Sequence, residues 1–245
     1  CGKEPGAFRK LIAEAAGVRE EHLLSTELFL YPRTKAVQTG LNGEFIVSPR
    51  LDDLQCAFAA FRGFTAGKKE KHICVYALFD NEEVGSATNQ GAGATFLKNT
   101  LTRISRSLGY SYDETQAMIA RSFMISADNG HALHPNHGEY ADPVNAPRLN
   151  EGIVIKFNAQ QKYATDGFSA AFFRDLCRRA KVPTQTFTNR SDIPGGSTLG
   201  NISNTKVSMP TVDIGLPQLA MHSSYETAGT KDTAYLVTAC TAFFE

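Results

Sequence analysis

The sequence has no excess of charge of either sign, because 25 Lys and Arg residues balance 25 Asp and Glu residues in a chain of 245. Nucleic-acid-binding proteins normally carry a basic excess or stripe, so this balance argues against that class. No apolar run approaches the roughly 18 residues that a membrane-spanning helix needs. The first residues lack the apolar stretch of a secretory signal. The chain does not begin with Met either, which suggests a processed or truncated product.

Cysteines with a metal-binding or disulfide spacing are also missing. Five cysteines occur, and no two of them form a CxxC pair. Scattered cysteines of this kind indicate neither a disulfide framework nor a zinc knot. Most of them lie in apolar neighbourhoods, where a free cysteine behaves as a small core residue. We therefore expect a reducing, cytoplasmic setting. The cysteines are Cys1, Cys56, Cys74, Cys177 and Cys240.

Hydrophobic residues make up 42% of the chain, enough for one large core or two small ones. Helical and strand-like periodicities alternate along it, which favours an α/β layered domain with a mainly parallel sheet. The run 72–79 is continuously apolar and predicts a strand buried on both faces. The expected helices are 8–16, 52–64, 92–108, 114–121 (capped by Asp113), 168–180 and 234–244. The other expected strands are 27–31, 44–47, 122–127, 152–157 and 209–214.

Acidic residues or a histidine follow four of the expected strands. Ligand crevices in open α/β sheets lie beyond the carboxyl ends of the strands, so these side chains should converge. Clustered acids repel one another unless a cation joins them, and carboxylates with histidine suit zinc, manganese or cobalt. Two ions would need a bridging carboxylate, a bridging water and a free acid to take its proton. The residues concerned are Asp52 and Asp53, Glu82 and Glu83, Asp128, and His222.

Simpler interpretations exist for each of these residues taken alone. Asp52 could cap the following helix, Glu82 and Glu83 could be a solvated pair, and Asp80 is typical of a turn. Lys156 follows an apolar strand and could extend to solvent.

Four motifs in order resemble the M18 aspartyl aminopeptidases, and the resemblance covers nearly the whole chain. It implies a three-layer α/β/α phosphorylase/hydrolase-like core with a mainly parallel or mixed central sheet. It also implies that the intact protein is a homo-oligomer, while the charge balance and the lack of a long apolar run argue against nucleic acid and membrane as partners. The motifs are SPRLDDL at 48–54, DNEEVGS at 80–86, SAD at 126–128 with HALHPN at 131–136, and PQLAMHS at 217–223.

The resemblance assigns roles at a centre of two divalent metal ions, zinc first, with cobalt or manganese as alternatives. Asp52 would bridge both ions, Glu83 and His222 would complete one ligand set, and Asp128 would serve the other. Glu82 would be the general base that activates a metal-bridging water. The implied activity is an aminopeptidase that releases N-terminal Asp or Glu from peptides.

Further residues are substrate-side or supporting groups by the same resemblance. Lys156 and Tyr163 would contact substrate, and a cation in the first pocket would explain a preference for acidic residues. The segment 190–198 resembles a substrate loop, whose glycines let backbone approach the ligand. It contributes Asp192, Gly195 and Gly196. His131 would support the metal ligands without binding metal.

The family pattern is incomplete in this sequence. Residues 1–45 resemble the tail of an inserted β-rich dimerisation domain, and 46–245 resemble the catalytic core without its first strand and helix segment. The segment that would supply a first histidine ligand has no counterpart, and Asp53 stands where the family has Asn. We also expect a cis peptide between Asp52 and Asp53. Two alternatives therefore remain: a catalytically silent fragment that keeps the fold, and a related dizinc carboxypeptidase or amidohydrolase.

Overall fold

The computed structural model describes residues 4–68, 70 and 72–245, and the chain divides into two units, one ending at Arg33 and one starting at Thr34. In the first unit, helix α1 (Ala7–Ala16) ends at Gly17, whose left-handed backbone (φ 67°) caps it as predicted. The 3-10 helix η1 (Glu20–His22) follows. The expected strand 27–31 is wrong: the segment has no regular structure, and its apolar side chains are exposed rather than packed against a sheet.

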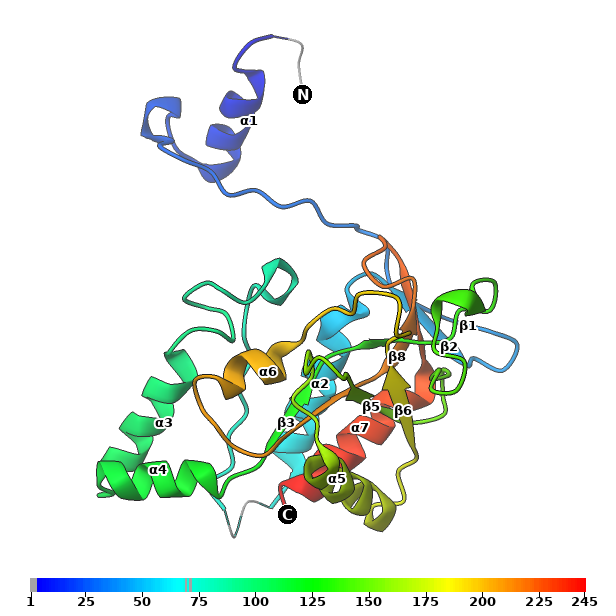
Figure 1. Cartoon of the computed structure of the whole chain (residues 1–245). Helices are drawn as coiled ribbons and strands as arrows, with labels where there is room; N and C mark the ends of the chain where they lie inside the picture. Colours follow the sequence, from blue (N-terminus) through cyan, green and yellow to red (C-terminus); the bar gives the residue numbers. More distant parts are fainter. Residues whose placement is uncertain (1–3, 69, 71) are drawn as a thin grey trace. The chain divides into compact units, whose positions relative to one another are not determined.

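The larger unit contains a mixed four-stranded sheet in the order β3-β7-β5-β6 (Figure 1). β3 runs parallel to β7 and β5 parallel to β6, whereas β5 and β7 are antiparallel. The β-branched residues of the two central strands, β5 and β7, are buried, and those of β3 and β6 are partly buried, which explains why the sequence forms strands here. The strands are β3 (Met124–Ala127), β5 (Ile153–Phe157), β6 (Thr184–Thr188) and β7 (Thr211–Gly215).

A second sheet continues from the ends of β3 and β7. Its order is β1-β2-β9-β8-β4, antiparallel except where β4 pairs with β8. The N–H of Asp128 donates to the carbonyl of Ile214 and that of Gly130 to Leu216, so the two sheets meet at Asp128. The strands are β1 (Val37–Thr39), β2 (Phe45–Ser48), β4 (Gly130–His131), β8 (Pro217–Leu219) and β9 (Glu226–Gly229).

Helices cover both faces of the four-stranded sheet. Val212 and Ile214 pack into the main core with Phe173 of α5 (Gly167–Arg179) and Leu236 of α7 (Thr230–Phe243). Asp213 lies between them in sequence and therefore points to the opposite face, where it contacts α6 (Leu199–Asn204). The expected three-layer α/β/α arrangement is thus confirmed.

Helix α2 (Leu51–Ala66) runs alongside α7 (Figure 1). A Cβ atom at Gly63 would lie 2.3 Å from the Cβ of Cys240, so only glycine permits this approach. Cys56, Cys177 and Cys240 are buried and free, as predicted, and Cys74 is half-buried; Cys1 lies outside the described residues.

The remaining helices are α3 (Phe96–Ser107) and α4 (Tyr112–Ala120), with the 3-10 turns η2 (Glu82–Val84) and η3 (Gly138–Tyr140). The expectation that Asp113 caps α4 is wrong. Ser111 is the cap, because its hydroxyl accepts from the Glu114 N–H and the Glu114 carboxylate accepts from the Ser111 N–H. In the described part of the chain, every helix is too short or too polar to cross a membrane.

The prediction of a buried strand at 72–79 is also wrong. Ile73 and Leu78 are 56% and 63% exposed, and none of the described strands pairs with this segment. It lies along α2 instead, where the Tyr76 hydroxyl donates to the Ala57 carbonyl (3.0 Å). The apolar pattern is suited to a strand, but a strand is stabilised only when a neighbouring strand receives its backbone hydrogen bonds.

Candidate metal centre

Asp52 lies just after β2, at the irregular first turn of α2. Arg50 takes the N-cap position with a left-handed backbone (φ 59°), and Asp52 is not helical (φ −81°, ψ 116°). The capping interpretation of Asp52 is wrong because its carboxylate accepts no helix N–H among the described residues: Oδ1 has no hydrogen-bond partner and Oδ2 lies against His222 Nε2. The peptide between Asp52 and Asp53 is cis, as expected. Within this turn the Asp52 side chain is only 6% exposed.

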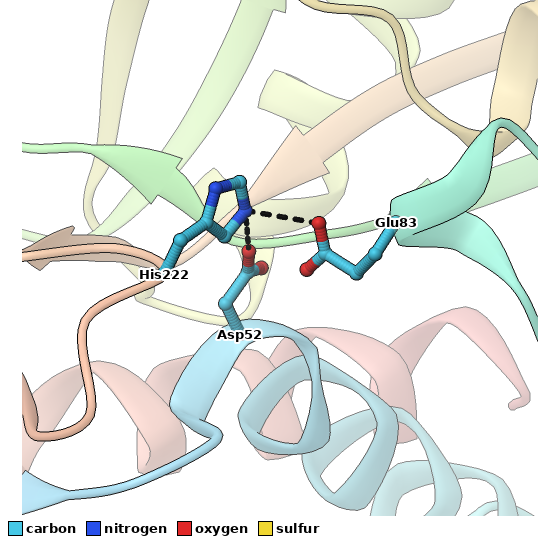
Figure 2. Close-up of side chains that lie close together, drawn as sticks. All are labelled: Asp52, Glu83 and His222. Atoms are coloured by element: carbon cyan, nitrogen blue, oxygen red, sulfur yellow. Dashed lines mark ion pairs between the residues drawn. The ribbon is translucent and has the colours of Figure 1, made fainter. Parts of the chain in front are cut away.

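Asp52, Glu83 and His222 point toward one another from three separate segments (Figure 2). The His222 Nε2 lies 3.2 Å from Asp52 Oδ2 and 2.9 Å from Glu83 Oε2. One ligand atom from each residue falls within 4.8 Å of the others, a spacing that can hold one divalent ion. Two carboxylates and an imidazole suit zinc.

A second cluster joins Asp52 to Asp53 and Asp128, again with ligand atoms within 4.8 Å of one another. Asp52 belongs to both clusters, which matches its expected bridging position. Asp53 also receives a hydrogen bond from the Asn129 N–H (3.1 Å). The family resemblance assigned Asp53 no ligand role, although Asp53 stands beside Asp52 among the acids that were expected to converge.

Burial and neighbouring negative charge raise the pKa of three acids at this site. Burial, followed by the nearby charges of Asp128 and Glu83, raises the pKa of Asp52 to about 8. Burial and the charge of Asp128 raise the pKa of Asp53 well above its usual range. Burial and Asp128 also raise the pKa of Glu82 to about 7. Such shifts are typical of functional sites, and a cation would relieve them.

One atom of this centre tests whether a metal fits. The Asp52 Oδ1 is buried and has no hydrogen-bond partner among the residues that the structure describes. Buried polar atoms normally have a partner, and a divalent cation would supply one here. The donor set and this orphaned oxygen therefore fit a metal centre.

Lys156 is the buried cation of the site. It is 2% exposed on β5, so the alternative in which it extends to solvent is wrong. Its Nζ donates to Asp128 Oδ2 (3.0 Å) and to the Asn129 carbonyl (2.7 Å), and lies 5.6 Å from the centre of the Tyr163 ring. Burial alone would lower the pKa of Lys156, but the charge and hydrogen bond of Asp128 together with Tyr163 and Asp213 outweigh this effect and raise the pKa. The ammonium group is therefore charged.

A cavity of about 790 Å³ opens onto the acid clusters. Burial and the charge of Lys156 lower the pKa of His131 at the cavity wall. Most of the predicted site residues line the cavity: Asp52, Glu82, Glu83, Asp128, His131, Lys156, Tyr163, Gly196 and His222.

Two predicted substrate residues do not line this cavity. Asp192 is exposed and pairs with Arg190, whose Nε lies 2.7 Å from Asp192 Oδ1. A Cβ atom at Gly195 would lie 2.6 Å from Asn189 Oδ1, so this glycine permits close packing against Asn189. Arg190 and Asn189 line the cavity in their place.

Sequence reasoning also missed Glu226, a buried acid on β9. Its carboxylate accepts hydrogen bonds from the backbone of Asp52 and of His222. Its sequence signal is an acid four residues after His222, which on its own does not distinguish it from an ordinary strand residue.

The model of the family described as aminopeptidase I zinc metalloprotease (M18) matches residues 2–244. A probable M18 family aminopeptidase 2 from Clostridium acetobutylicum is 47% identical over 227 residues, covering 93% of this chain and 52% of that protein. An M18 aminopeptidase structure from Thermotoga maritima aligns with a TM-score of 0.89 at 28% identity, covering 100% of this chain and 56% of its own. The S. cerevisiae mApe1 dodecamer gives 0.81 at 29%, covering 99% and 56%.

The chain thus spans about half the length of the curated relatives it matches. The family match nevertheless includes every segment that contributes to the two acid clusters. It confirms the resemblance carried by the four motifs and the phosphorylase/hydrolase-like fold. This chain belongs to the M18 family of zinc metalloprotease aminopeptidases.

Proposed function

We propose that this chain carries the active site of a metal-dependent aminopeptidase that releases N-terminal Asp or Glu from peptides. The observation that supports this most is the sharing of Asp52 by two ligand clusters, with one of its buried oxygens left without a partner. A single carboxylate common to two clusters is the arrangement that a two-metal hydrolase requires.

The two clusters would each hold one divalent ion, and the zinc in the family description makes zinc the first choice. Asp52, Glu83 and His222 form the first ligand set; Asp52 and Asp128, with Asp53 beside them, form the second. When bound, such ions polarise a peptide carbonyl and lower the pKa of water.

Glu82 is suited to move the proton. Neither cluster found among the described residues includes it, although it lines the same cavity. Its pKa of about 7 lets it accept a proton from the attacking water and return it to the leaving amine near neutral pH. The two adjacent acids therefore have different roles: Glu83 is a metal ligand and Glu82 is the general base.

Two cationic side chains on the cavity wall support a preference for acidic substrates. Lys156 lies between Asp128 and the Tyr163 ring. Arg190 lines the same cavity from the loop 189–198. A substrate carboxylate near Lys156 would share it with Asp128. Arg190 has a planar guanidinium suited to a second contact with a carboxylate.

The intact protein would be a homo-oligomer. The solved relative described as a dodecamer shares 99% of this chain's length at a TM-score of 0.81. The large apolar side chains Phe58 and Phe61 on α2 and Leu78 beside it are exposed, as expected of a surface that further polypeptide covers.

The test compares the two adjacent acids. Metal content and hydrolysis of Asp-, Glu-, Asn- and Leu-terminated peptides are measured for the unsubstituted chain, Glu82→Gln and Glu83→Gln. We expect two zinc ions in the unsubstituted chain and faster cleavage of Asp and Glu peptides. Glu82→Gln should keep both ions while turnover falls by about 10²–10⁴-fold; Glu83→Gln should lose zinc.

Three outcomes contradict the proposal in different ways. No turnover together with at most one weakly bound zinc ion would favour the catalytically silent fragment. Cleavage that depends on a free substrate carboxylate instead of a free amine would favour the carboxypeptidase alternative. Full turnover in Glu82→Gln would remove Glu82 from the mechanism.

A further inference from the structure

Glu226 connects the backbones of two metal-ligand candidates. It is 2% exposed on β9. Its Oε2 accepts from the Asp52 N–H at 3.0 Å, and its Oε1 accepts from the His222 N–H at 2.8 Å. Both carboxylate oxygens are therefore occupied by main-chain donors, one from each of two segments that contribute side chains to the first ligand cluster.

The sheet places Glu226 between these two segments. Ser48, the last residue of β2, lies opposite Glu226 in the antiparallel β2–β9 pair. The chain leaves β2 and reaches Asp52 four residues later, while His222 lies four residues before β9 begins. Both ligand-bearing segments thus emerge at the same end of this strand pair, and the Glu226 side chain fills the space between them.

The backbone at His222 needs such an anchor. His222 and Ala220 both have left-handed backbones, with φ of 65° and 57°. This conformation is unfavourable for residues with a Cβ atom. The His222 N–H donates to a buried carboxylate, and such a charge-assisted hydrogen bond is stronger than a neutral one and holds this turn in place.

We propose that Glu226 is a positioning residue that fixes the separation of Asp52 and His222, so that their side chains reach the same ion. This inference rests on the proposed function, since it assigns the pair to one metal. A carboxylate is required because both of its oxygens accept. A glutamine at this position would accept one N–H and turn its own NH₂ group toward the other.

Asp232 offers a matched control for a purely structural role. It is as buried as Glu226, and its carboxylate also accepts from two backbone donors, the Asn150 N–H (2.7 Å) and the Gly152 N–H (3.2 Å). None of these residues belongs to either ligand cluster among the described residues. Asp232→Asn therefore makes the same chemical change without touching a ligand-bearing segment.

The experiment uses the 245-residue chain with Glu226→Gln, Glu226→Asp or Asp232→Asn. Zinc affinity is measured by competition with a chelating dye, the ligand geometry by the visible spectrum of the cobalt-substituted protein, and stability by thermal unfolding without metal. We expect Glu226→Gln to weaken zinc binding by about 10–100-fold and to alter the cobalt spectrum. Asp232→Asn should lower the unfolding temperature but leave affinity and spectrum unchanged.

Glu226→Asp keeps both acceptor oxygens and withdraws them by one methylene group. Its zinc affinity should lie between those of the unsubstituted chain and Glu226→Gln, and it provides the measurement if Glu226→Gln does not fold. Unchanged zinc affinity in the Glu226 variants, or an equal loss in Asp232→Asn, overturns the inference. If the unsubstituted chain binds no zinc, both the proposed function and the inference about Glu226 fail.

Discussion

The two ligand clusters share Asp52 but differ in exposure and in chemistry. The cluster with Glu83 and His222 is open, since the His222 side chain is 63% exposed, and it contains a nitrogen ligand. The cluster with Asp53 and Asp128 is more enclosed, contains oxygen ligands only, and has Lys156 bonded to one of its acids. The open cluster thus offers three side chains, two carboxylates and one imidazole, to a single ion. In the enclosed cluster, the ammonium group of Lys156 already pairs with Asp128.

The difference lies in the protein groups that compensate the clustered acids. In the enclosed cluster, Lys156 compensates Asp128, while Asp52 and Asp53 respond to burial and to neighbouring charge with raised pKa values. In the open cluster, His222 itself contacts both carboxylates. Each cluster therefore has a protein partner that a bound ion would replace or supplement.

Removing the shared residue should have the largest effect. We expect Asp52→Ala to abolish binding of both zinc ions and all measurable peptidase activity, because it takes a ligand from each cluster. Metal content after gel filtration and peptide hydrolysis give the readout. Asp80→Ala is the control, since Asp80 bonds the N–H of Asn81 in its turn and should leave both ions bound. Asp52→Ala with two bound zinc ions would show that Asp52 does not bridge.

Single-cluster substitutions should separate the two halves. His222→Ala should leave one ion in the enclosed cluster, whereas Asp128→Asn should leave one ion in the open cluster. Zinc content should fall from two to one in each case. The cobalt-substituted proteins should differ, because only the open cluster offers an imidazole nitrogen. Loss of both ions in either variant would mean that the clusters bind only as a unit.

Substituting Lys156 tests how much its positive charge stabilises the acids of the enclosed cluster. Lys156→Met leaves the buried Asp128 carboxylate without its cation, which should cost about 3–5 kcal/mol of unfolding free energy in the metal-free chain. The surface pair of Arg178 and Asp175 is the control, and Arg178→Met should cost under about 1 kcal/mol. Urea denaturation measures both. Equal small losses would show that the Lys156 pair contributes little.

Asp232 is a buried acid outside the metal centre, and its titration should have the smallest effect on the free energy of unfolding. It shows what burial alone does to the pKa of a carboxylate, for comparison with both clusters. Burial raises the pKa of Asp232 to about 6, above the value of about 4 expected in the unfolded chain. The folded state therefore binds this proton more tightly, and stability falls as pH rises from about 4 to 6, by up to about 3 kcal/mol. Comparing unfolding free energies of the chain and of Asp232→Asn over this range measures it. Identical pH profiles would contradict the shift.

The sequence predicted most of the helices and strands. It failed where the presence of a neighbouring strand decides whether a segment becomes a strand. The run 152–157 and the run 72–79 carry similar apolar patterns, but only the first is a strand, β5, buried between β6 and β7. In the second, Ile73 and Leu78 are exposed along α2. Apolar periodicity records the tendency to be buried. It does not record whether a neighbouring strand is present.

The division of the chain remains partly a prediction. The described units separate at Arg33, and β1, at residues 37–39, pairs with β2 in the larger unit. The origin of residues 1–45 in an inserted dimerisation domain stays a prediction, as does the cytoplasmic location.

The sequence by itself indicated the acids and the histidine that the two clusters contain, together with Glu82, which lines the same cavity but belongs to neither cluster found among the described residues. It also determined the family, because four short motifs occur in order. Only the tertiary structure decided that Asp53 joins the second cluster, that Lys156 is buried against Asp128, and that Glu226 bonds the backbones of Asp52 and His222. The reason is physical: residue type and spacing report local tendencies, whereas these contacts join segments far apart in the sequence, such as Asp52 and Glu226, which are 174 residues apart.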